Sequence, residues 1–371
     1  MYDNRKRLLT ILIIAALIFS LFTLYISSEE RLSLSARSAA LYEPETNRFI
    51  YTKNSNERLG MASTTKIMTA LIALENLEEN EVIIAPDEAC GIEGSSIYLE
   101  PGESLSAIDL VYALMLQSAN DAACVLAYRI AGGIESFAEL MNAKASELGL
   151  LDTHFTNPHG LDDEEHYTTA HDLALLSAEA IKNESLQKIT STVRKNIESS
   201  LKTRTLINHN KMLRFYDGCI GLKTGYTKRC GRCLVSCAKK DGLYVIAVSI
   251  DAPDDWRDHT KMLDHAYSLL EKRVLCERGD FSYDIPLIGG SVDSVRISAS
   301  KDFSVVVEKN SPEIEHTVKL SGYFSAPIAK GDVLGKVIFT SEGKEIGQAD
   351  LIAEATVDAP KPKKKFFSFI Y

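Results

Sequence analysis

The spacing of hydrophobic residues changes along the chain, and each change marks a different kind of element. Apolar side chains at helical spacing predict helices that cover residues 63–77, 106–116, 121–131, 134–148 and 171–181. Short apolar runs bounded by turn residues predict strands at residues 38–42, 49–51, 224–227, 232–238 and 244–250, followed by a closing helix at 259–270. Strands at both ends with helices between them predict an α+β domain, in which helices pack against a sheet.

The pattern changes again near residue 275. From residue 281 to residue 353, short strands such as 304–307 and 336–339 are separated by glycine and charged turns, and no helical period is present. This pattern predicts a small all-β domain that resembles a sandwich. The expected division is therefore an α+β domain at residues 33–275 and a β domain at residues 276–357.

Residues before the first domain have the composition of an export signal. Arg5, Lys6 and Arg7 precede the uncharged stretch 8–26, which is longer than a usual signal-peptide core and close to the length of a membrane-spanning helix. Residues 1–32 are therefore either a cleaved signal peptide or a retained membrane anchor. Both interpretations place the two domains outside the cytoplasmic membrane.

The last residues, 358–371, are rich in proline and lysine and then in aromatic side chains. Two interpretations are open. The segment is a disordered tail, or it contacts an anionic membrane surface through its basic and aromatic residues. The composition favours neither.

Composition excludes some classes of function. The net charge of −10 over 371 residues argues against nucleic acid as a partner, because phosphate binding needs clustered lysine and arginine. The seven cysteines are an odd number, so at least one thiol of an exported chain is free or bonded to another chain. We expect buried free thiols or one disulfide. We expect no cofactor and no metal, since the most cysteine-rich segment matches no common zinc spacing; its members are Cys219, Cys230, Cys233 and Cys237.

Ser63 and Lys66 carry the strongest chemical signal. They lie three residues apart at the start of an apolar helical stretch, so their side chains share one helix face. Burial disfavours the charged form of a lysine and lowers its pKa, and a neutral amine can take the proton of a neighbouring serine hydroxyl. The alternative is a serine that caps the helix beside a solvated lysine.

Two further motifs follow in the chain. Ser118-Ala119-Asn120 lies between two apolar helical runs, and Lys223-Thr224-Gly225 lies just before strand-like runs. Each alone has an ordinary explanation, as a helix cap or as a turn at the end of a strand. Together and in this order, Ser-x-x-Lys, Ser-x-Asn and Lys-Thr-Gly are the motifs of the serine penicillin-recognising enzymes.

The residues around these motifs sharpen the resemblance. Residues 62–70, 94–99, 118–123, 157–161 and 221–227 are similar to the D-alanyl-D-alanine carboxypeptidases, the low-molecular-mass penicillin-binding proteins of the bacterial envelope. The resemblance is strong over residues 38–267 and looser up to residue 353. It implies a serine peptidase that removes the terminal D-alanine from the peptidoglycan stem peptide, is acylated by penicillins and other β-lactams, and is attached to the cytoplasmic membrane. Ala119 stands where many members carry glycine.

Four residues are candidates for the catalytic steps. Ser63 is the expected nucleophile and Lys66 the base that deprotonates it. Ser118 is expected to relay the proton to the leaving amine, and Asn120 to hold the substrate's amide carbonyl and orient Lys66. By analogy with the family, the backbone N–H groups of Ser63 and Tyr226 form the oxyanion hole.

Five residues are candidates for substrate binding. Lys223 is expected to supply positive charge near the terminal carboxylate of the substrate and to disfavour protonation of Lys66. Thr224 offers a hydroxyl to that carboxylate, Gly225 lets substrate backbone approach the strand, and Tyr226 supplies its N–H. Arg257 stands where the family carries an arginine near this carboxylate; the alternative is a solvated charge in the acidic segment around it.

Two rival functions fit the sequence less well. A β-lactamase relies on a glutamate that activates the deacylating water, and no convincing Glu-x-x-x-Asn occurs between Asn120 and Lys223. A non-catalytic sensor of the same fold should have lost part of the motif set, whereas Ser63, Lys66 and Lys223 are all present. Carboxypeptidase and endopeptidase action are not separated, because both cut beside a D-alanine.

Overall fold

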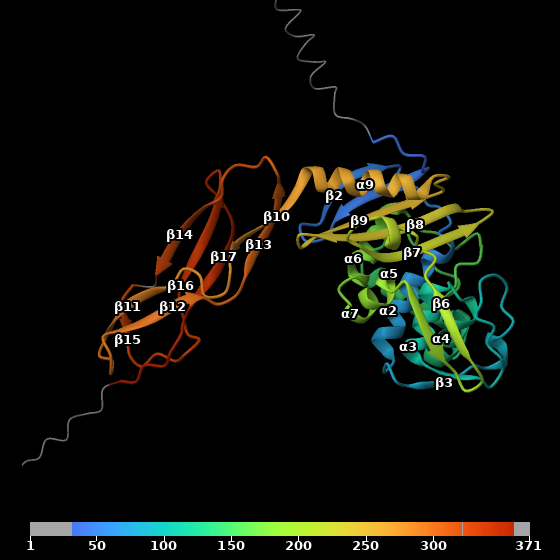
Figure 1. Ribbon diagram of the computed structural model, residues 1–371, viewed down its shortest axis with the longest axis horizontal. Coiled ribbons are helices and arrows are strands. Elements are labelled where there is room, and N and C mark those ends of the chain that lie inside the picture. The colour runs from blue at the N-terminus through green and yellow to red at the C-terminus, as the bar shows by residue number, and fades with distance from the viewer. Residues whose placement is uncertain (1–31, 321, 360–371) are drawn as a thin grey trace, which may run out of the picture. The chain divides into compact units, whose positions relative to one another are not determined.

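The computed structural model describes residues 32–320 and 322–359, which form two compact units (Figure 1). The first contains residues 32–42 together with Phe49–Cys237 and Ile246–Leu263. The second contains Glu43–Arg48, Ala238–Val245 and the described residues from Asp264 to Ala359. Apart from Leu32, Asp358 and Ala359, the predicted export signal and the basic tail lie outside the described residues. Among those described, no helix is both long and apolar enough to cross a membrane.

A five-stranded sheet in the order β2-β1-β9-β8-β7 is the framework of the first unit. The strands that come first and last along the chain are neighbours in the sheet, because β1 pairs antiparallel with β9 from Ser38↔Ile250 to Tyr42↔Ile246. Every residue of β1 is buried: most are small or apolar, and the carboxylate of Glu43 accepts hydrogen bonds from the backbone N–H groups of Glu45 and Thr46. The strands are β1 (Ser38–Glu43), β2 (Arg48–Lys53), β7 (Cys219–Thr227), β8 (Gly231–Lys240) and β9 (Leu243–Ile250).

Helices cover both faces of this sheet: α9 lies on one face and α2 to α7 on the opposite one (Figure 1). At their centre is α2, which is buried from Lys66 to Ala73 and packs against five other helices, α3 to α7. The helices are η1 (Ala62–Thr65), α2 (Lys66–Asn76), η2 (Asp87–Ala89), α3 (Ala107–Leu116), α4 (Asn120–Ala131), α5 (Ile134–Glu147), α6 (Ala170–Ala180), α7 (Glu184–Ser191), α8 (Met212–Phe215) and α9 (Asp255–Leu269).

Side-chain caps fix where several helices begin. The Ser106, Thr169 and Asn183 side chains each accept a hydrogen bond from a backbone N–H three residues later, at the starts of α3, α6 and α7. Such caps satisfy N–H groups that have no partner inside the helix. The sequence pattern missed α7 and two short strand pairs, namely β3 (Val82–Ile84) with β4 (Ser104–Ser106) and β5 (Arg194–Glu198) with β6 (Thr203–Ile207).

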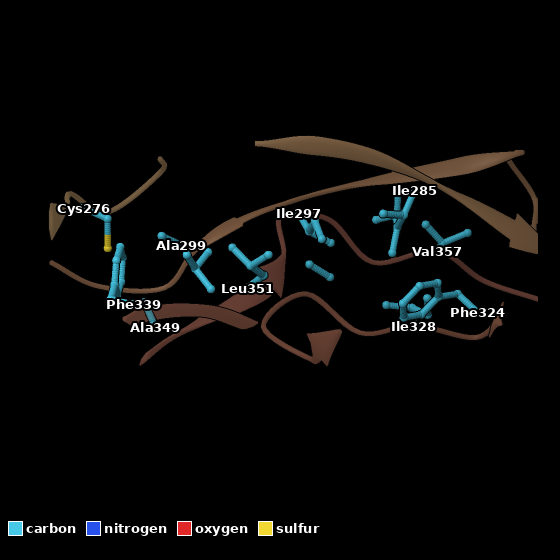
Figure 2. Close-up of a cluster of buried hydrophobic side chains, with 13 residues drawn as sticks. Cys276, Ile285, Ile297, Ala299, Phe324, Ile328, Phe339, Ala349, Leu351 and Val357 are labelled. Atoms are coloured by element: carbon cyan, nitrogen blue, oxygen red, sulfur yellow. The ribbon is translucent and has the colours of Figure 1, made fainter. Parts of the chain in front are cut away.

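The second unit carries the all-β domain. A six-stranded sheet has the order β14-β16-β17-β12-β11-β15, and β10 pairs with β13. Figure 2 shows its core, in which side chains such as Ile285, Ile297, Phe339 and Leu351 are buried. The α+β fold class with a following all-β domain is thus confirmed. The strands are β10 (Leu270–Cys276), β11 (Tyr283–Ile288), β12 (Ser294–Ala299), β13 (Phe303–Glu308), β14 (Glu315–Leu320), β15 (Phe324–Ser325), β16 (Val333–Ser341) and β17 (Lys344–Ala353).

All seven cysteines have free thiols in the structure. The structure therefore agrees with the expectation of free thiols and not with that of one disulfide. Burial raises the pKa of the Cys233 thiol to about 12, so this group stays protonated at neutral pH. Cys230, Cys233 and Cys237 are buried in or beside β8, where they act as small apolar side chains.

Candidate active site

A cavity of about 340 Å³ opens where η1, the α3–α4 turn and β7 meet. Five of the residues expected at the site line it, namely Ser63, Ser118, Thr224, Gly225 and Tyr226. The other lining residues were not among the expected site residues: Ser95, His209, Lys211, Arg232, Asp255 and Trp256. Of these, only Ser95 lies in a segment that carried the family resemblance.

Lys66 is fully buried behind the cavity. Its Nζ lies 3.0 Å from the Oγ of Ser63 and donates to the Oδ1 of Asn120 at 2.7 Å. Nζ also donates to the backbone carbonyl of His159. Burial, and then the charge of Lys223, hold the pKa of Lys66 well below its usual value. Desolvation and a like charge both disfavour the ammonium form, which favours a neutral amine beside the Ser63 hydroxyl.

The helix starts one turn later than the sequence pattern predicts. Ser63 lies in the short 3₁₀ turn η1, and α2 begins at Lys66. The Ser63 side chain makes no capping hydrogen bond, so the alternative of a simple helix cap does not describe it. In a 3₁₀ turn, residues three apart lie directly above one another. The hydroxyl and the amine therefore still face each other.

Two glycines let other segments approach this turn closely. Gly160 has φ +85, and a Cβ there would lie 2.0 Å from the carbonyl oxygen of Ala62. A Cβ on Gly225 would lie 3.1 Å from the backbone nitrogen of Ser63. Distances this short exclude larger side chains unless the backbone moves. The turn that contains Ser63 is thus held between the loop around Gly160 and strand β7.

A histidine supports the same turn from inside the protein. His166 accepts a hydrogen bond from the backbone N–H of Thr156 at Nδ1, and its Nε2 lies 2.7 Å from the hydroxyl of Thr65. Burial lowers the pKa of His166 to about 4, so the ring is neutral and carries its proton on Nε2. The Thr65 hydroxyl in turn donates to the Ala62 carbonyl. This chain of hydrogen bonds orients η1 without adding a charge.

Asn120 links Lys66 to the loop that contains Glu93 and Ser95. Its Oδ1 accepts from Lys66, its Nδ2 donates to the Glu93 carbonyl, and its backbone N–H donates to the Ser95 carbonyl at 2.7 Å. The cap position of α4 is Ala119, with no side-chain hydrogen bond, so Asn120 is not a simple cap. Ser118 has φ +60, a rare conformation for a residue with a side chain, and its side chain lines the cavity.

Asp121 fixes the loop that supplies Ser95. This buried carboxylate accepts hydrogen bonds from the hydroxyl of Ser96 at 2.6 Å and from the backbone N–H of Leu99 at 3.0 Å. It also accepts from the Ile97 N–H. The loop and the first turn of α4 are therefore one hydrogen-bonded unit.

Lys223 lies below the cavity surface rather than on it. The residue is 1% exposed, and its Nζ donates to the backbone carbonyl of Thr224 at 2.9 Å. Burial lowers its pKa to about 7. Near neutral pH, Lys223 therefore carries only part of a positive charge. The residues of its motif that line the cavity are Thr224 and Gly225.

Arg257 is not among the residues that line the cavity. Its side chain is 72% exposed, and its carboxylate neighbour is Asp254 at 3.9 Å. Arg257 therefore has the exposure of a solvated charge, which was the alternative to a role in substrate binding. The arginine at the cavity is Arg232, on β8.

Comparisons with known proteins agree with the residues and the fold. The family model for D-alanyl-D-alanine carboxypeptidase matches residues 26–254, and that for the C-terminal domain of penicillin-binding protein 5 matches residues 270–359. D-alanyl-D-alanine carboxypeptidase DacF of Bacillus subtilis is 34% identical, over 98% of this chain and 97% of that protein. DacC of Escherichia coli is 29% identical, over 88% of this chain and 85% of its own.

Solved structures give the same result. Penicillin-binding protein 5 from Haemophilus influenzae has a TM-score of 0.64 at 27% identity, over 88% of this chain and 98% of that one. A point mutant of the Streptomyces K15 DD-transpeptidase has a TM-score of 0.62 at 30% identity, over 64% of this chain and all of its own. The chain therefore belongs to the D-alanyl-D-alanine carboxypeptidase family, as a serine peptidase of the penicillin-binding type.

Proposed function

We propose that Ser63 is the nucleophile of this carboxypeptidase and that Lys66 is the base that activates it. The observation that carries this proposal is the 3.0 Å separation between the Lys66 Nζ and the Ser63 Oγ, at a lysine whose pKa burial lowers. An amine that is neutral at working pH can accept the hydroxyl proton, and the alkoxide then forms as it attacks.

The reaction divides into two steps. Ser63 Oγ attacks the carbonyl carbon of the penultimate D-alanine while its proton passes to Lys66. The negative oxygen that forms is stabilised by the backbone N–H groups of Ser63 and Tyr226. The proton then reaches the leaving amine through the Ser118 hydroxyl, the C–N bond breaks, and D-alanine departs. Water hydrolyses the resulting ester on Ser63. One oxyanion donor stabilises a transition state by ~3 kcal/mol.

Residues in and beside the same cavity are proposed to recognise the substrate. Asn120 lies beside Lys66 and is proposed to hold the amide carbonyl of the substrate. Thr224 lines the cavity and offers its hydroxyl to the terminal carboxylate, with Lys223 buried behind it. Gly225 leaves room for an extended peptide along β7. The ligands are the peptidoglycan stem peptide that ends in D-Ala-D-Ala, and β-lactams, which acylate the same serine.

Release of D-alanine tests this function directly. A stem pentapeptide that ends in D-Ala-D-Ala should lose one D-alanine per molecule, while the matched peptide that ends in D-Ala-L-Ala should stay intact. The protein should also form a penicillin adduct that persists long after free penicillin is removed. Rapid turnover of penicillin without release of D-alanine would instead support the β-lactamase alternative.

We propose that the protein acts at the outer face of the cytoplasmic membrane, where its polymeric substrate lies. The support is the basic and then uncharged stretch of residues 1–32 and the basic, aromatic segment 358–371. If residues 8–26 are an anchor, the full chain stays in the membrane fraction, and a chain that starts at Ser33 is soluble and active. A mature N-terminus near Ser35, together with membrane retention after deletion of the tail, would leave both attachments without support.

A further inference from the structure

The wall of the cavity contains an arginine that the expected substrate contacts do not use. Arg232 is near the start of β8, the strand beside β7 in the sheet. Its side chain is 45% exposed and lines the cavity together with Thr224 and Gly225. A guanidinium keeps its positive charge at any physiological pH. A peptide that enters the cavity therefore meets a permanent cation on the side of β8.

Neighbouring side chains hold this guanidinium in place. Its Nε lies 3.1 Å from the Oδ2 of Asp255, whose side chain is 5% exposed. The guanidinium carbon lies 6.0 Å from the centre of the Trp256 ring, and that ring makes an edge contact with Phe215. An ion pair and a cation–π contact together restrict an otherwise flexible side chain. The contact with Asp255 is made through Nε, and a guanidinium has two further nitrogens whose N–H groups can donate to an anion.

Other cations fit a carboxylate ligand less well. Lys223 is buried, and its Nζ already donates to a backbone carbonyl. Arg257 is exposed and does not line the cavity. Lys211 does line it, but an ammonium on a flexible chain cannot match a carboxylate with two parallel hydrogen bonds, as a guanidinium can.

We propose that Arg232 binds the C-terminal carboxylate of the peptide substrate, together with the hydroxyl of Thr224. This inference rests on the proposed function, and it names the residue that makes the site select a free carboxyl end. Arg232 thus takes the recognition role for which the family resemblance suggested Arg257. Asp255 and Trp256 are then positioning residues, which act on the substrate only through Arg232.

The test compares one peptide in two forms, with a free C-terminal carboxylate and with a C-terminal amide. The ratio of their kcat/KM values measures selection for the carboxylate. In Arg232→Gln this ratio should fall roughly 10- to 100-fold, because one charge-assisted hydrogen-bonding partner is lost. Arg229→Gln removes an exposed arginine from the adjacent turn and should leave the ratio unchanged. Arg232→Lys keeps the positive charge but cannot form two parallel hydrogen bonds with a carboxylate, so it should lower the ratio by a smaller factor.

Asp255→Asn provides a second variant that retains the guanidinium. It should lower the ratio less than Arg232→Gln does, since only the hold on Arg232 is weakened. An equal loss on both peptide forms in Arg232→Gln would mean that Arg232 is only structural, and the proposal would be overturned. A selective loss in Arg257→Gln or Lys211→Gln, with none in Arg232→Gln, would overturn it too.

Acylation by penicillin and by its methyl ester separates this inference from the proposed function. Both reactions are followed by protein mass and need no release of D-alanine. A protein that released no D-alanine would contradict the proposed function. In that same protein, a selective loss of reaction with the free acid in Arg232→Gln would still support the carboxylate site, and an equal loss with acid and ester would contradict it.

Discussion

Replacing Ser63 with alanine is expected to reduce D-alanine release about a million-fold below that of the unmodified protein. The loss is this large because the variant has no atom that can form the acyl-enzyme. The cavity and the hydrogen bonds of Lys66 to Asn120 and His159 should remain, so the variant should still bind the peptide.

Ser191→Ala is the matched control for this result. Ser191 is an exposed serine at the end of α7, away from the residues that line the cavity. Its substitution removes the same hydroxyl group and should leave release of D-alanine unchanged. Turnover by Ser63→Ala above about one per cent of the normal rate would require a different nucleophile.

Lys66→Met is expected to slow acylation by roughly 10²- to 10⁴-fold, the usual contribution of a positioned general base. Methionine fills the buried space without an amine. It leaves the Asn120 Oδ1 and the His159 carbonyl without their donor, which costs about 1–3 kcal/mol of stability for each group. Circular dichroism and a thermal melt should therefore accompany the acylation rates, to separate loss of the base from loss of the fold.

The pH dependence of acylation identifies this base. Below the lowered pKa of Lys66 the amine is protonated and cannot accept a proton, so the rate should rise with pH and level off above that pKa. In Lys66→Met this rise should disappear. In Lys223→Met it should move to higher pH, because the charge of Lys223 is the second cause that lowers the pKa of Lys66. An unchanged rise in Lys66→Met would assign the base to another group.

Local spacing is enough to predict that Ser63 and Lys66 share one site. Side chains three residues apart meet in a 3₁₀ turn as well as in an α-helix, so the exact start of α2 does not matter for this pair. The same local rules predict the long helices of the first unit. They miss β5, where a single buried residue, Ile197, stands among polar ones, because a strand with so little apolar surface resembles a loop.

Contacts between distant segments leave no such local signal. The pairing of β1 with β9 joins residues about two hundred positions apart, and the approach of Gly160 to Ala62 depends on how a whole loop folds. In the sequence Arg232 is an ordinary arginine after a turn. Its place in the cavity wall and its contacts with Asp255 and Trp256 depend on the folded chain. Because α9 begins at Asp255, Arg257 stands two positions along the first turn, and residues two apart do not share a helix face.

Some predictions concern parts of the chain that the structure does not describe or boundaries that it leaves open. The division at residue 275, the signal or anchor at residues 1–32 and the membrane contact of residues 358–371 stay predictions. The two terminal predictions depend on composition, which indicates the environment that a segment prefers but not the contacts that it makes.

The most direct test of the central claim is the position of the penicillin adduct. The protein is incubated with penicillin and its intact mass is measured by mass spectrometry. It is then digested, so that the modified peptide can be identified. One penicillin per chain, on the peptide that contains Ser63 and absent from Ser63→Ala, is the predicted result. An adduct of undiminished amount in Ser63→Ala, or one that maps to another serine, would contradict the account.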